Sequence, residues 1–184
     1  MQKILTGQIL LILCCIFYLI WWYRGYRPGI MVSRVGGINA LLLLITMILG
    51  VAGIIFSLMR LPEKTTPKIP PAIIPLAGIV IYIILLFVTR IVFHRIVTTE
   101  LILIVAWMTV EVTVVNRLNA AGFLMDQEFY LQGIVIAVAV LISLVLYAAY
   151  YRMEDMKAFY AAMVPLITEG LAMAVLVGML VKAR

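Results

Sequence analysis

The chain has 184 residues, of which 66% are apolar and 12% are charged, and its mean hydropathy is +1.22. A soluble globular domain has about half apolar and about a quarter charged residues, and a disordered chain is poor in apolar residues. This composition excludes both classes. The chain is predicted to be a polytopic membrane protein that folds as one transmembrane domain, with the lipid bilayer around it.

The net charge of +6 comes from 14 Lys and Arg residues against 8 Asp and Glu residues. In a soluble chain, such an excess suggests nucleic acid as a partner. Here the basic residues lie almost wholly in short connectors between apolar segments, where they contact lipid headgroups. We therefore expect no nucleic-acid partner, and no connector is long enough to hold a soluble domain.

Six segments are apolar and long enough to cross a bilayer, which takes about 20 helical residues for ~30 Å of hydrocarbon. They cover residues 4–23, 38–59, 72–89, 99–118, 129–151 and 158–181. We predict an all-α fold in which these segments form a bundle of six transmembrane helices. The fourth segment is the weakest, because Glu111 interrupts its apolar run, but a five-span arrangement leaves that run in water.

The aromatic residues give a check on topology, because Trp and Tyr favour the two membrane interfaces. Trp21 and Trp22 close the first segment, Tyr150 closes the fifth and Tyr160 opens the sixth. Six spans place all of these residues on one side of the membrane. The first segment runs into its tryptophans without a small-residue cleavage site, so we expect a retained anchor instead of a signal peptide.

Six spans divide the 14 basic residues equally between the two sides of the membrane. The positive-inside rule therefore assigns no orientation. Two explanations stay open: other features such as the first helix set one orientation, or the chain inserts both ways and forms an antiparallel homodimer. Reporter fusions at both termini distinguish them, since a single side for each terminus excludes dual insertion.

Glu169 is the sharpest candidate for a substrate-binding residue, because it lies near the centre of the sixth segment. A charged group at the bilayer centre costs at least ~2.5 kcal/mol, so such a carboxylate faces the protein interior and often marks an ion or substrate path. Pro165, four residues earlier, removes a backbone hydrogen bond and predicts a helix kink beside the carboxylate.

Glu111 is a second candidate, on the fourth segment. Helical spacing places Glu100, Trp107 and Glu111 on one face, with Trp107 one turn before Glu111. A tryptophan beside a buried carboxylate is typical of a site for an organic cation, which is attracted by the charge and by the ring face. In the alternative interpretation, Glu111 bonds locally to Thr109, Asn116 or Arg117. Trp107 then fills the core.

Small residues recur along the sixth segment, mostly four positions apart, and include Gly170, Ala174 and Gly178. They predict a smooth ridge for close helix packing, either within the chain or against a partner membrane subunit or second copy. Polar residues within the segments are expected to line a cavity or to bond between helices. These are Gln8, Asn39, Thr46, Tyr82 and Gln132.

The sequence favours a protein that is not an enzyme. His94 is the only histidine, no known catalytic or nucleotide-binding motif is present, and no Cys or His cluster has metal-ligand spacing. We therefore expect no metal and no cofactor. The hypothesis is a multi-pass plasma-membrane protein that binds and moves a small solute, cationic or proton-coupled. The alternative is an accessory subunit or scaffold that docks a partner membrane protein.

Overall fold

A computed structural model describes residues 1–29, 36–94, 99–150 and 152–182 of the chain, without the side chains of 93, 99 and 100. Its regular structure is entirely helical over these residues. The helices are α1 (Gln2–Tyr26), α2 (Ile38–Ser57), α3 (Ile73–Phe93), α4 (Thr99–Ala120), α5 (Asp126–Tyr150), α6 (Asp155–Ala161) and α7 (Val164–Lys182).

Six stretches of helix are long and apolar enough to span a membrane, and α6 and α7 together make the sixth. The predicted bundle of six transmembrane helices is therefore confirmed. Helix α5 begins at Asp126, three residues before the predicted segment. The Glu128 carboxylate accepts a hydrogen bond from the backbone N–H of Met125 at 2.9 Å, as in a capping box, which stabilises this earlier start.

The sixth span differs from the single continuous segment 158–181 that was predicted. Helix α6 ends at Ala161 and α7 begins at Val164, so the break covers residues 162–163. Pro165 is the second residue of α7, where a missing backbone N–H leaves no helical hydrogen bond unmade. The Thr168 hydroxyl donates to the carbonyls of Val164 and Pro165, which ties down this first turn.

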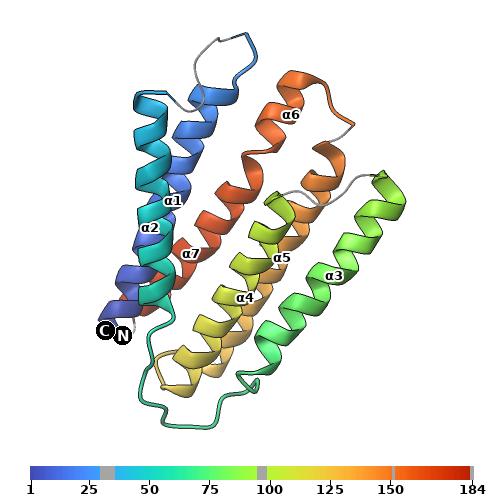
Figure 1. The fold of residues 1–184 in the computed structure, drawn as a ribbon. Coiled ribbons are helices and arrows are strands. Elements are labelled where there is room, and N and C mark those ends of the chain that lie inside the picture. The colour runs from blue at the N-terminus through green and yellow to red at the C-terminus, as the bar shows by residue number, and fades with distance from the viewer. Residues whose placement is uncertain (30–35, 95–98, 151, 183–184) are drawn as a thin grey trace.

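Successive spans run in opposite directions, and the two chain termini lie at the same end of the bundle (Figure 1). Helix α1 packs along α2 on one side and against α7 on the other, α7 packs on α5, and α5 on α4. Helix α3 packs mainly on α4 and so lies at the edge of the bundle (Figure 1). Helix α4 also makes a few contacts with α2 and with α7, which bring these helices together around the interior of the bundle.

The apolar core lies where α1, α4, α5 and α7 meet. It includes Ile4, Val114, Leu118, Ile136 and Leu176, all of them nearly or fully inaccessible to solvent. In contrast, α2 and α3 present rows of exposed leucine, isoleucine and valine side chains on the outside of the bundle. In water such a surface would be a large apolar patch, whereas in a bilayer it contacts lipid tails.

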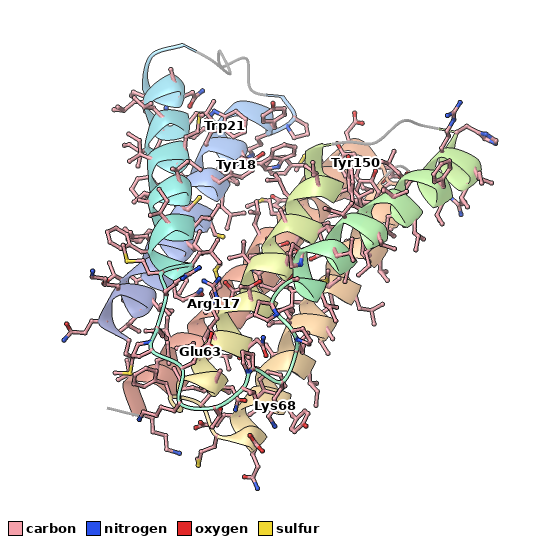
Figure 2. All side chains as sticks on the ribbon, turned by 60° about the horizontal axis from the view of Figure 1, so that its bottom comes forward. Tyr18, Trp21, Glu63, Lys68, Arg117 and Tyr150 are labelled. Carbon is pink, nitrogen blue, oxygen red and sulfur yellow. The ribbon has the colours of Figure 1, made fainter. Side chains whose placement is uncertain are left out.

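Aromatic rings gather at the end of the bundle opposite the termini. Trp22 stacks on Tyr26 of its own helix with ring centroids 4.2 Å apart, and its other contact is Phe159 of α6. Figure 2 shows Trp21 of α1 and Tyr150 of α5 at this same end. The interfacial aromatics of different spans therefore share one side, as six crossings require.

The connector between α2 and α3, residues 58–72, is held against α4. The Asn116 side chain donates to the Ile69 carbonyl at 2.7 Å and accepts from the Ile69 N–H at 3.1 Å. Lys68 pairs with Asp126 at 2.9 Å, and this hydrogen bond raises the pKa of the lysine. Figure 2 shows Lys68 on this connector, at the end of the bundle that carries the termini.

Replacement of Asn116 by Ala is expected to release this connector while leaving the helices intact. Both hydrogen bonds to Ile69 are lost, and each contributes about 1 kcal/mol, so amide exchange at Ile69 should accelerate about fivefold or more. Hydrogen–deuterium exchange with mass spectrometry measures this rate. Thr113→Ala is the matched control, because the Thr113 hydroxyl bonds the carbonyl of Thr109 on its own helix and not the connector. Unchanged exchange of Ile69 in Asn116→Ala would contradict the assignment.

Candidate functional site

The interior of the bundle contains a set of buried polar residues despite the apolar composition. Among the described residues, two of them are ionisable carboxylates, Glu111 at 0% and Glu169 at 6% exposure. Gln8, Ser57 and Gln132 are fully buried as well. These five residues come from α1, α2, α4, α5 and α7, so every helix that encloses the core contributes one of them.

A close approach of α1 and α2 positions the first part of the site. At Gly7 there is no room for a side chain, since a methyl group would overlap the backbone nitrogen and hydroxyl of Ser57. A methyl group at Gly53 would likewise overlap the side chain of Leu11. Glycines at crossing points allow helix backbones to approach closely in membranes. The contact places Gln8, the next residue of α1, beside Ser57.

Gln8 links α1 to the carboxylate on α4. Its Nε2 donates to Oε1 of Glu111 at 2.9 Å and lies 3.3 Å from the Ser57 hydroxyl oxygen. The other oxygen of Glu111, Oε2, and the amide oxygen of Gln8 are both buried without a hydrogen-bond partner. One half of the Glu111 carboxylate is therefore fixed by the protein, and the other half is unpartnered.

The local alternative for Glu111 does not match these contacts. Asn116 bonds the backbone of Ile69, and Arg117 donates to the carbonyl of Leu58 (Figure 2 labels Arg117). These two side chains thus bond the connector after α2, and the Thr109 hydroxyl donates to a backbone carbonyl of α4 itself. Glu111 is bonded across the bundle instead of along its own helix.

Glu169 lies on the buried face of α7, together with Ala172, Met173 and Leu176. The next residue, Gly170, packs toward α1, where a Cβ would lie 3.9 Å from that of Cys15. Glu111 of α4 is bonded to Gln8 of α1, and α7 packs against both α1 and α4. The structure therefore brings the two predicted carboxylates into one interior region between α1, α4 and α7.

Neither interior carboxylate is neutralised by a basic residue of the described chain. The ion pairs there join Lys68 to Asp126 and Lys157 to Glu154, both at the ends of the bundle. An isolated charge in a medium of low dielectric constant costs several kcal/mol, so it is normally paired, protonated or bound to a ligand. The site thus has an unmet requirement for a positive charge or a proton.

Trp107 lies one turn before Glu111 on α4 and is half-buried. Its indole Nε1 is buried without a hydrogen-bond partner. Glu100, the third residue predicted on this face, belongs to α4, but its side chain is outside the described part of the structure. Trp107 and Glu111 therefore supply an aromatic surface, a donor and a carboxylate along one helix.

Gln132 of α5 was expected only as a general cavity or packing residue. Its Nε2 donates to the carbonyl of Ala172 at 2.9 Å, three residues after Glu169, while its amide oxygen is buried without a partner. Among the described side chains, the buried unpartnered atoms are thus three acceptors, on Gln8, Glu111 and Gln132, and one donor, on Trp107. The three acceptors lack N–H or O–H donors.

Three residues were predicted to form a small-residue ridge on α7, and one of them packs against another helix of the chain. Gly170 packs toward Cys15, whereas Ala174 and Gly178 are exposed, and nothing lies within 4 Å of a Cβ placed at Gly178. The C-terminal part of this ridge, Ala174 and Gly178, therefore faces outward from the bundle.

Comparisons with protein-family models, with curated proteins and with solved structures find no match for this chain.

Proposed function

We propose that this multi-pass membrane protein binds a small solute and moves it across the plasma membrane, with Glu111 and Glu169 as charge partners. The solute is cationic or its movement is coupled to protons. The observation that carries the proposal is a pair of buried carboxylates without a basic partner in the described chain, one of them with an unpartnered oxygen.

A purely structural role would not require carboxylates at these positions. The hydrogen bond from Gln8 to Glu111 needs only an acceptor oxygen, which a glutamine at 111 would supply without the cost of burying a charge. Charged groups at membrane depth are expensive, by about 2.5–3.5 kcal/mol on insertion scales, and they mark ion and proton paths. The cost of burying these two carboxylates therefore favours a functional role for both glutamates.

Each residue of the site has a distinct proposed role. Gln8 is a positioning residue, because its amide fixes one oxygen of Glu111 and leaves the other for the ligand. Trp107 forms a wall whose ring face attracts a cation by about 0.5–2 kcal/mol. Glu169, near the middle of the span that α6 and α7 form together, receives the proton or cation from the same interior region.

Reconstitution into proteoliposomes tests this function. An internal pH-sensitive dye reports protons, and a panel of small organic cations reports solute uptake. Wild-type protein should move protons or one of these cations faster than protein-free vesicles. Glu111→Gln should reduce the rate about tenfold or more, because a charged contact to a ligand is worth roughly 1.5–3 kcal/mol. Equal rates in wild type, Glu111→Gln and protein-free vesicles would contradict the proposal.

The second candidate is a non-transporting subunit that docks a partner membrane protein. The supporting observation is the outward-facing Ala174 and Gly178 on α7, which offer a smooth surface for another helix. In this case Glu169 would pair with a basic residue of the partner. A subunit should lose stability when the partner is removed, whereas a carrier should bind its ligand alone.

A further inference from the structure

Residues near the C-terminal ends of α3 and α5 line a groove. These two helix ends lie at the end of the bundle opposite the termini (Figure 1). The groove has a volume of about 430 Å³. It is lined by Val92, Val145, Ala148, Ala149, Arg152 and Met153. The lining is apolar apart from one guanidinium group, and none of these residues belongs to the interior site.

The groove exists because of the residues on its two walls. Ala148 and Ala149, in the last turn of α5, are too small to fill the space toward α3, which packs mainly on α4. Val92 of α3 and Val145 of α5 stand at the opening, both more than half exposed. An apolar groove that opens sideways from a membrane helix bundle faces lipid tails.

Arg152 lies at the rim of the groove. Its backbone N–H bonds the carbonyl of Ala149 at 2.9 Å, which continues the turn at the end of α5 and keeps the arginine above the alanines. Its side chain is exposed, and within the described chain it makes no hydrogen bond or ion pair. The nearby Glu154 is paired with Lys157 at 3.2 Å. The guanidinium is therefore available to an anion from outside the chain.

The depth of Arg152 matches a lipid headgroup. Tyr150 is two residues earlier, and Trp21 and Trp22 of α1 lie at the same end of the bundle (Figure 2). Trp and Tyr settle at the level of the headgroups. Arg152 lines an apolar groove at that level. Its charge therefore lies where a lipid phosphate lies, and the groove lies where an acyl chain lies.

We propose that this groove is a binding site for an anionic phospholipid, with the phosphate on Arg152 and one acyl chain along Ala148 and Ala149. Guanidinium binds phosphate through two parallel N–H donors, which makes arginine a better phosphate ligand than lysine. A net negative headgroup is favoured over a zwitterionic one, because the choline cation of the latter would lie near Arg152. The site does not depend on the proposed transport function.

Native mass spectrometry of the protein in nanodiscs made of equal parts phosphatidylglycerol and phosphatidylcholine tests the site. Wild-type protein should retain phosphatidylglycerol preferentially after the disc is disrupted. Arg152→Gln should reduce that retention about fivefold, as expected for one basic residue at an anionic surface. Ala149→Leu fills the groove without changing any charge, and it should reduce retention as well.

Arg27→Gln is the matched control, because Arg27 directly follows α1, whose C-terminal end lies at the same end of the bundle (Figure 1). Its guanidinium is half-buried, donates to the Tyr23 hydroxyl at 2.7 Å and lies over the Tyr23 ring. This variant should retain as much phosphatidylglycerol as wild type. An equal loss in Arg27→Gln, unchanged retention in Arg152→Gln, or a homodimer without retained lipid would each overturn the proposal. If Ala149→Leu fails to fold, the exposed Arg152 substitution still decides the question.

Discussion

Glu169→Gln is expected to lower the rate of solute or proton movement about tenfold or more and to remove its dependence on pH. Glutamine has nearly the same shape as glutamate but neither carries charge nor exchanges a proton. The loss corresponds to one charged contact with the ligand, roughly 1.5–3 kcal/mol. Proteoliposome flux measured across a range of external pH values gives both the rate and its pH profile.

The fold should survive this substitution, because Glu169 makes no hydrogen bond or ion pair within the described chain. Circular dichroism and the melting temperature of the purified variant check this point. Glu154→Gln is the matched control, since its exposed carboxylate pairs only with Lys157 at the bundle end. A Glu169→Gln profile that overlays the wild-type profile at every pH would refute a role for this residue.

Gly7→Ala is expected to destabilise the protein by forcing two helices apart. The added methyl would overlap the backbone nitrogen and hydroxyl of Ser57, so α1 and α2 must separate. Overpacking of this kind costs about 1–3 kcal/mol, which corresponds to a fall of roughly 2–12 °C in the melting temperature of a chain this long. Thermal unfolding in detergent micelles measures the change.

Gly133→Ala provides the comparison for Gly7→Ala. Gly133 lies in the interior of α5, and nothing is within 4 Å of a Cβ at that position. The substitution should be neutral or slightly stabilising, because Ala favours helix over Gly. Equal shifts of the melting temperature in both variants would contradict the close contact between α1 and α2 that positions Gln8.

The architecture was accessible from sequence because burial in a bilayer leaves a strong local signal. Each span is a run of about 20 apolar residues, and the run itself is visible without knowledge of its neighbours. The break between α6 and α7 was not predicted as a break, because apolar residues continue through positions 162–163. Pro165 indicated the right place, four residues after the end of α6, but not whether the helix would bend or stop.

The site was predicted only in part, because its contacts join residues far apart in the chain. Glu111 and Glu169 stand out in sequence as carboxylates within apolar runs. The partner of Glu111 is Gln8, 103 positions away, and nothing in the spacing of either helix indicates that they meet. Gln132 also reaches its partner on another helix, 40 positions away. Such pairs follow from the order in which helices pack, which periodicity within one helix does not contain.

Native mass spectrometry of the protein extracted gently from its own membrane tests the central claim most directly, since one spectrum reports stoichiometry, partner chains and retained small molecules. The account predicts a monomer or homodimer that carries a discrete small mass, distinct from lipid, and that loses this mass in Glu169→Gln. A stable complex with another membrane chain and without a small mass would contradict it and would move the question of function to that partner.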